Sequence, residues 1–344
     1  MPAGGGQNLP GSKTILSETI QSLKFNGLLS VNIPSGALAV SDPVYFPLLP
    51  AQIITVSIFL RKGQAGGQIT SHPGSRTQTW MTQGENTHAA DFADPTTRSV
   101  FHWYFLSCIE AWQPRENGAF VLIGDSLTDG RGSTDNANDR WPDLLFNRML
   151  EHPFARNISV LNQAAGGNRI LTDGKGRSVL SRLDRDVFAQ SGVRYVMIFH
   201  GVNDIGTAEP DIESQGAIGE KLIHAYKQII SLIHGFGIPV FCSTIAPFMA
   251  PESIGQPYAV ATMEATRQRI NSWMRSESVF DAVIDFDVVL RDPLNKSFLK
   301  EEFNSGDYLH PNVRAYQAMA EAFPLAIFEQ ARCNLISLVA GISK

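Results

Sequence analysis

Residues 119–130 read AFVLIGDSLTDG, an unbroken apolar run that ends in a polar turn flanked by glycines. An apolar run of this kind is typical of a strand that is buried on both faces of a sheet. Similar short runs follow it at 159–163, 194–199, 239–244 and 282–286. We therefore expect a sheet of five strands in the C-terminal two thirds of the chain.

Helical patterns alternate with these strands. At about 214–235 the apolar residues recur on one stripe, as on a helix that packs against a core. Further helices are expected near 141–151, at about 258–276 and from about 313 to 331. Strands that alternate with helices predict βαβ units, and hence an α/β fold with a mainly parallel sheet covered by helices on both faces.

The N-terminal third has a different texture. Between residues 15 and 115 the chain shows short β-type runs broken by Gly and Pro, and no convincing amphipathic helix. The runs are LLSVNI (28–33), ALAVSDPVYF (37–46) and IITVSIFL (53–60). A polar turn cluster, QPRENG, closes this part. We expect three regions: a β-rich layer at 1–115, an α/β domain at 116–332 and a tail at 333–344.

Composition excludes several classes of function. The 344 residues carry 28 Lys+Arg against 33 Asp+Glu, so the net charge of −5 leaves no basic footprint for nucleic acid or an anionic membrane. No run approaches the length of a membrane-spanning helix. Three cysteines are too few for a disulfide framework or a four-ligand zinc site. The first residues lack a basic segment that leads into an apolar one, so no signal peptide is predicted.

Small and polar residues follow four of the five expected strands, the first, second, third and fifth. In an open parallel sheet, ligands bind at the carboxyl ends of the strands, so these residues are expected to converge. They include a serine, an asparagine, an aspartate and a histidine, which can serve as a hydroxyl nucleophile, an oxyanion donor, an orienting carboxylate and a base. The segments are GDSLTDG (124–130), NQAAGGN (162–168), GVND (201–204) and GDYLHP (306–311).

These segments, in this order, resemble the four sequence blocks of the GDSL or SGNH hydrolase family, over about residues 118–332. The resemblance implies a flavodoxin-like five-stranded parallel sheet sandwiched by helices. It also implies a catalytic triad in which Ser126 is the nucleophile, His310 the base and Asp307 the carboxylate that orients His310.

The same resemblance implies an oxyanion hole. It also implies that the reaction needs no metal ion and no cofactor. The donors of the oxyanion hole are the backbone N–H groups of Ser126 and Gly167 and the side-chain amide of Asn203. A glycine suits position 167 because a side chain would hinder the approach of its amide to a substrate.

The upstream part resembles the β-rich N-terminal region of a branch that contains aryl and acetylxylan esterases. Relatives in that branch generally carry more N-terminal chain, so we expect the layer at 1–115 to be truncated. They are often extracellular, whereas no export signal is visible here, so the cellular location stays open.

Several neighbouring residues admit two interpretations. His200 ends the third strand and is the rival base, although a hydrogen-bonded wall residue is the more common role at a strand end. Trp141 and Tyr308 flank catalytic blocks and are as typical of a core as of an acyl or sugar pocket. The candidate substrate-binding residues are Trp141, Tyr308 and His200.

Acidic residues near the blocks are expected to brace loops rather than to react. This applies to Asp125, Asp129 and Asp204. His72, in the β-rich part, is expected to have a structural role, with a position over the site as the alternative.

The sequence thus predicts a serine esterase that hydrolyses small acyl esters through an acyl-serine intermediate. The expected partner is a small-molecule or carbohydrate acyl ester. An O-acyltransferase with the same triad, and an inactive carbohydrate-binding protein, are the alternatives. The acyl chain, the alcohol and the oligomeric state are not readable from the sequence.

Overall fold

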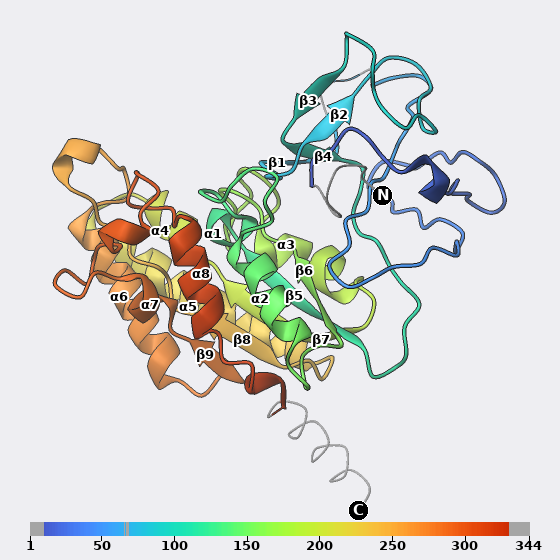
Figure 1. Ribbon diagram of the computed structural model, residues 1–344. Coiled ribbons are helices and arrows are strands. Elements are labelled where there is room, and N and C mark those ends of the chain that lie inside the picture. Colours follow the sequence, from blue (N-terminus) through green and yellow to red (C-terminus); the bar gives the residue numbers. More distant parts are fainter. Residues whose placement is uncertain (1–9, 65, 67–68, 330–344) are drawn as a thin grey trace, which may run out of the picture. The chain divides into compact units, whose positions relative to one another are not determined.

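The computed structural model describes residues 10–64, 66 and 69–329, and these fall into two units (Figure 1). The first unit holds the described residues up to Ser71 together with Thr77–Tyr104. The second holds His72–Arg76 and the chain from Phe105 onward. The tail expected at 333–344 lies outside the described residues.

The second unit is built on a parallel sheet of five strands in the order β6-β5-β7-β8-β9. The expected α/β fold with a flavodoxin-like sheet is confirmed. In this order the chain leaves β5 toward β6 and later returns to the other side of β5, so the strand order reverses between β5 and β7, the place where ligands bind in open parallel sheets. The strands are β5 Gly118–Gly124, β6 Ile158–Asn162, β7 Val193–Phe199, β8 Val240–Ser243 and β9 Ala282–Ile284.

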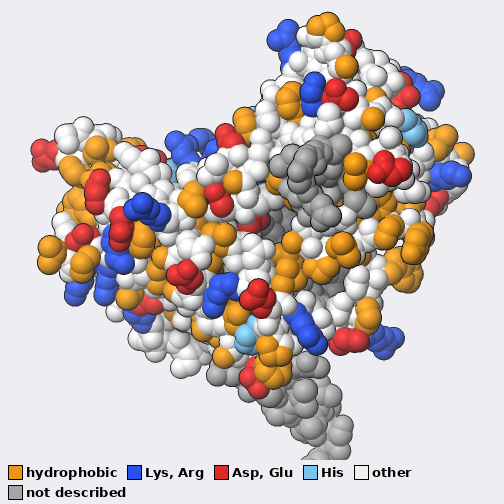
Figure 2. All heavy atoms as spheres, in the orientation of Figure 1, with side chains coloured by type: hydrophobic (Ala, Val, Ile, Leu, Met, Phe, Trp, Pro, Cys, Tyr) orange, Lys and Arg blue, Asp and Glu red, His pale blue; other side chains and the backbone are white. Residues whose placement is uncertain are grey.

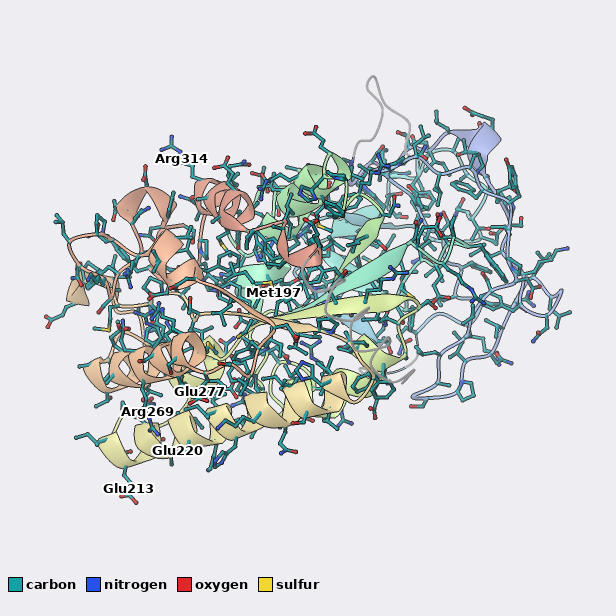
Figure 3. The ribbon with its side chains drawn as sticks, turned by 90° about the horizontal axis from the view of Figure 1, so that it is seen from below. Met197, Glu213, Glu220, Arg269, Glu277 and Arg314 are labelled. Atoms are coloured by element: carbon teal, nitrogen blue, oxygen red, sulfur yellow. The ribbon has the colours of Figure 1, made fainter. Side chains whose placement is uncertain are left out.

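Helices cover both faces of this sheet. Figure 3 shows α5 and α6 together on one face, with α8 on the other, and α2 packs against α8. Glu220 of α5 and Arg269 of α6 form an ion pair across the seam between their helices (Figure 3). The long helices are α2 Trp141–Leu150, α5 Ile212–His234, α6 Ala261–Ser276 and α8 Val313–Ala322.

Shorter helical turns connect the long elements, and two of them begin at strand ends that carry site residues. The short α-helices are α1 Ser126–Asp129, α3 Val179–Leu183, α4 Val202–Gly206 and α7 Phe286–Leu290. Single turns of other helical types are η1 Ser17–Thr19, η2 Asp184–Phe188, η3 Glu252–Ile254 and η4 Glu301–Phe303.

Aromatic packing fills the core beside the central strand. The ring of Phe120 in β5 packs edge-on against Phe328 at 5.3 Å and Phe241 of β8 at 5.9 Å. All three side chains are fully buried. Burial of one such side chain stabilises a fold by about 1.5–3 kcal/mol. The sheet therefore gives the site a rigid base.

The last long helix is shorter than expected. It was predicted to continue to residue 331, but α8 ends at Ala322. Phe323 adopts an extended conformation with ψ 120° and precedes Pro324. A residue before proline is sterically disfavoured in the helical region, so the helix stops there.

The N-terminal strands form small antiparallel sheets, as the β-rich texture predicts, but at other positions than expected. In β2 and β3, Trp80 is paired with Ser99. The runs at 28–33, 37–46 and 53–60 contain no strand. A β-type run becomes a strand only where it finds a partner and a face to bury. The strands are β1 Ser71–Pro73, β2 Thr79–Met81, β3 Arg98–Val100 and β4 His102–Tyr104.

Charged side chains of both signs are interspersed over the face that Figure 2 shows. None of the helices in the described part of the chain combines the length and the apolar character that crossing a bilayer requires.

Candidate active site

The serine of the first block stands where β5 ends and α1 begins. Asp125 is the N-cap of α1, and its Oδ1 accepts a hydrogen bond from the Leu127 N–H at 3.1 Å. This cap fixes the turn, because it satisfies a helix donor that would otherwise lack a partner. Ser126 is consequently the first residue of α1, directly after the carboxyl end of β5, where the strand order reverses.

The histidine of the last block is held by an aspartate three residues earlier on the same loop. Asp307 Oδ1 accepts the N–H groups of Leu309, at 3.0 Å, and of His310, at 2.8 Å. Asp307 Oδ2 lies 2.7 Å from His310 Nδ1. Tyr308, between the pair, has a φ of +56°, an uncommon conformation for a residue other than glycine that folds this loop back on itself.

These contacts determine the charge of Asp307 and the tautomer of His310. Partial burial acts to raise the pKa of Asp307, but hydrogen bonds from the ring and backbone of His310 outweigh it and hold the pKa well below its usual range. An ionised carboxylate only accepts hydrogen bonds. His310 Nδ1 therefore carries a hydrogen, and its Nε2 is free to act as an acceptor in the neutral ring.

Ser126 and His310 meet across a separation of 184 positions in the sequence. The distance from Ser126 Oγ to His310 Nε2 is 2.9 Å, and both residues are buried. The loops that carry them approach closely at Gly132, where a Cβ would lie 2.2 Å from the carbonyl oxygen of Pro311. The structure thus brings Ser126, His310 and Asp307 into one hydrogen-bonded line.

A tight turn after β6 lies beside the end of β5. The N–H of Asn168 donates to the carbonyl of Ala165 at 3.1 Å and closes the turn, while the Ala165 N–H donates to Gly124 at 3.1 Å. Gly167, third in the turn, has a φ of +71°, which favours glycine. In the described part of the chain, the N–H groups of Gly167 and Ser126 donate to no acceptor.

Asn203, in the first turn of α4, faces the same turn. Its Nδ2 donates to the carbonyl of Asn168 at 3.0 Å, and its Oδ1 accepts from the hydroxyl of Tyr258 at 3.2 Å. Burial raises the pKa of Tyr258, so this hydroxyl keeps its hydrogen. Because an amide nitrogen carries two hydrogens, one Nδ2–H of Asn203 remains after the bond to Asn168.

Comparison with known proteins places this constellation in a family. The model of the GDSL-like lipase/acylhydrolase family matches residues 122–318, more than half of the chain. The chain belongs to this family. Membership makes the protein a hydrolase of the esterase or acylhydrolase class, for which small esters are the substrates.

Solved structures with a similar fold include other GDSL proteins. A G-D-S-L family protein from Desulfitobacterium hafniense is 23% identical, over 60% of this chain and 97% of that chain, with a TM-score of 0.44. A GDSL-like lipase from Bacteroides thetaiotaomicron is 16% identical over 64% and 93% (TM-score 0.43). An acetylxylan esterase from Geobacillus stearothermophilus is 16% identical over 61% and 94% (TM-score 0.43). No curated protein matches the chain.

Two candidate substrate-binding residues of this GDSL-family hydrolase lie in the interior. Trp141 is fully buried against Phe286, and its Nε1 donates to Thr128 Oγ1 at 3.3 Å. His200 is 1% exposed and accepts the Gly201 N–H at Nδ1, at 2.9 Å. Trp141 thus takes the core position and His200 the hydrogen-bonded position, each of which was one of the two interpretations of its residue.

The other residues singled out in the sequence are either partly exposed or hydrogen-bonded to neighbouring loops. Tyr308 is half-buried, and its hydroxyl donates to Glu301 at 2.6 Å. Burial lowers the pKa of His200 well below its usual value, so this ring is neutral, and it lies 3.3 Å from Asn168 Oδ1. Asp204 accepts the N–H groups of Ile170 and Leu171, at 2.9 and 3.0 Å.

Two residues that contact the site of the GDSL-family hydrolase, Asn168 and Tyr258, were not predicted from the sequence. Asn168 follows the glycine pair directly, and that position is the signal that could have drawn attention to it. Its Oδ1 accepts two hydrogen bonds from Arg182, at 3.2 and 3.0 Å. Tyr258 has no comparable signal, because nothing local links it to Asn203. Within residues 10–64, 66 and 69–329, no cluster of His, Cys, Asp or Glu is arranged to hold a metal ion.

The cap of α1 makes the stability of the GDSL-family hydrolase depend on pH. Burial raises the pKa of Asp125 to about 7, against roughly 3.9 in an unfolded chain. Between these values the folded state binds the extra proton, so the free energy of unfolding falls as pH rises, by roughly 1 kcal/mol per pH unit. Asp125→Asn keeps an acceptor for Leu127 and cannot ionise.

We therefore expect Asp125→Asn to flatten the decline of stability with pH between about pH 4 and pH 7. Urea unfolding of the variant and the wild type at several pH values in this window measures the two slopes. Equal slopes would contradict the burial of an ionisable carboxyl at this position.

Proposed function

We propose that the protein is a serine esterase that hydrolyses small carboxylic esters through an acyl-serine intermediate. The observation that carries the proposal is the 2.9 Å contact between Ser126 Oγ and His310 Nε2, with Asp307 behind the imidazole. A serine hydroxyl becomes an effective nucleophile only when a neighbouring base takes its proton.

In the proposed acylation step, Ser126 Oγ attacks the ester carbonyl and His310 Nε2 takes the hydroxyl proton. Asp307 stabilises the imidazolium that results. The tetrahedral intermediate then collapses, the bond to the alcohol breaks, and His310 returns the proton to the leaving alcohol. The acyl group is left as an ester on Ser126.

In the proposed deacylation step, His310 takes a proton from water, and the resulting hydroxide attacks the acyl carbon. Collapse of the second intermediate releases the carboxylic acid and returns the proton to Ser126. In both steps the carbonyl oxygen becomes negative, and the unpaired N–H groups of Ser126 and Gly167 with the Nδ2–H of Asn203 are the donors that we assign to it.

A fluorophosphonate probe and an ester substrate test the proposal together. We expect the full chain to hydrolyse para-nitrophenyl acetate, and the probe to label Ser126 and to abolish turnover as it reacts. Peptide mass spectrometry locates the label. A chain that neither reacts with the probe nor turns over aryl esters would refute the esterase and favour an inactive carbohydrate-binding protein.

Removal of the proposed side-chain donor gives a quantitative prediction. Asn203→Ala should lower kcat by about 10²–10³-fold with little change in KM, because the donor acts mainly in the transition state. Tyr258→Phe should lower kcat by about two- to tenfold, since one neutral hydrogen bond that orients the amide is lost.

Steady-state kinetics on an aryl acetate measures both effects. Phenylalanine keeps the aromatic ring that packs on Gly206. The loss of kcat in Tyr258→Phe therefore reports the hydrogen bond to Asn203 and not the packing of the ring. A wild-type kcat in Asn203→Ala would remove Asn203 from the oxyanion hole.

A further inference from the structure

A histidine from the short segment His72–Arg76 lies behind the nucleophile turn. His72 Nε2 is 2.7 Å from Asp129 Oδ1. The second oxygen of this carboxylate, Oδ2, accepts the N–H of Gly166 at 3.0 Å. A hydrogen-bonded line therefore runs from His72 through Asp129 to the residue directly before Gly167.

Hydrogen bonds from Arg140 and Asn136 fix the segment that carries His72, and Arg140 also bonds to Asp129. Arg140 donates from Nε to the carbonyl of Asp129 at 3.1 Å and from Nη2 to the carbonyl of Ser75. The N–H of Asn136 donates to the carbonyl of Arg76 at 2.8 Å. Ser75 itself is buried. The imidazole is thus presented to Asp129 from an anchored backbone.

The turn that contains Gly166 and Gly167 can adopt more than one backbone conformation. Its central residues are Gly166 and Gly167, and glycine populates positive and negative φ about equally. The two common turn types differ by a rotation of the peptide between these central residues, and that rotation reverses the direction of the Gly167 N–H. A glycine pair therefore needs outside contacts to keep this N–H pointing one way.

Contacts on both sides of the turn supply that restraint. On the downstream side, the carbonyl of Asn168 accepts from Asn203. On the upstream side, Asp129 holds the N–H of Gly166, and hydrogen bonds to a carboxylate are stronger than neutral ones. His72 in turn fixes the carboxylate, whose side chain is 13% exposed.

We propose that His72 is a positioning residue for the oxyanion hole: through Asp129 it holds the Gly166–Gly167 turn with the Gly167 N–H directed at the substrate oxygen. The inference rests on the proposed esterase function. It assigns a part in catalysis to the segment His72–Arg76, which lies outside the four sequence blocks.

The test compares two substitutions at position 72 with a matched control elsewhere. His72→Ala removes the donor, whereas His72→Gln keeps an N–H at a similar reach. The control is His234→Ala, because His234 Nε2 lies 2.8 Å from Asp281 Oδ2, which also accepts the Val240 N–H at 2.7 Å. This is a similar arrangement, a histidine and a backbone N–H on one carboxylate, although both bonds are to Oδ2 here, and it lies outside the proposed catalytic machinery.

Rates are expressed per active site, with sites counted by fluorophosphonate labelling, so that misfolded chains do not enter. We expect kcat of His72→Ala to fall about tenfold or more, less than the 10²–10³-fold typical for loss of an oxyanion donor, with KM little changed. His72→Gln should recover most of the loss. His234→Ala should keep the wild-type kcat.

An unchanged kcat per labelled site in His72→Ala would overturn the inference, and so would an equal loss in His72→Gln. A loss of the same size in His234→Ala would show that the lower kcat of His72→Ala comes from general destabilisation, and would also overturn the inference. An inactive wild type would instead refute the proposed function, which separates the two failures.

Discussion

Replacement of Ser126 by alanine is expected to lower kcat for an aryl acetate by about 10⁶-fold, the loss typical when the nucleophile of a serine hydrolase is removed. The variant lacks the oxygen that would carry the acyl group, so only binding and oxyanion stabilisation remain. His310, 2.9 Å away, keeps its bond to Asp307. The loss should therefore come without unfolding.

Thermal unfolding and single-turnover kinetics measure this expectation. Ser133→Ala is a suitable control, because its hydroxyl belongs to the same loop but donates to the carbonyl of Gly130 at 2.6 Å. It should retain nearly the wild-type kcat. Substantial turnover by Ser126→Ala in a correctly folded protein would exclude the acyl-serine route.

The substitution Asp307→Asn should have the second-largest effect, about 10⁴-fold in kcat. Asparagine has nearly the same shape, but its amide nitrogen donates where the carboxylate accepts. His310 can then adopt the other tautomer, and the imidazolium that forms during acylation loses its counter-charge. The rate should fall while the structure of the loop is kept.

The pH dependence of kcat/KM and the size of the loss measure the role of this carboxylate. Asp292→Asn is the matched control, since Asp292 Oδ1 also accepts two backbone N–H groups, both at 2.8 Å, in another loop. Near wild-type turnover by Asp307→Asn would reduce the triad to a Ser–His pair. The double variant with Ser126→Ala should be no slower than Ser126→Ala alone, because the two residues act as one unit.

The helices and strands of the α/β unit could be predicted closely because their signal is local. Five short apolar runs became β5 to β9, and the stripe at 214–235 became α5. The same reasoning failed in the first unit. Leu29 and Val40 in the expected strands are 74% and 77% exposed. An apolar run there found no partner strand, and pairing is a property of two segments, not of one.

The types and order of the proposed reacting groups were readable from the chain, because each block follows a strand and parallel strands end on one edge. Which of these side chains contact one another was decided by the tertiary structure. His310, and not His200, lies against Ser126, and Trp141 is in the core.

Tyr258 meets Asn203 across 55 positions, and His72 meets Asp129 across 57. The local periodicity of the sequence predicts the secondary structure of a segment and which of its residues are buried. It does not predict which distant side chain lies within hydrogen-bond distance, since that depends on how separate segments pack together. Short motifs thus contain the residues of the proposed triad, whereas the proposed oxyanion donors are held by contacts with residues outside those motifs.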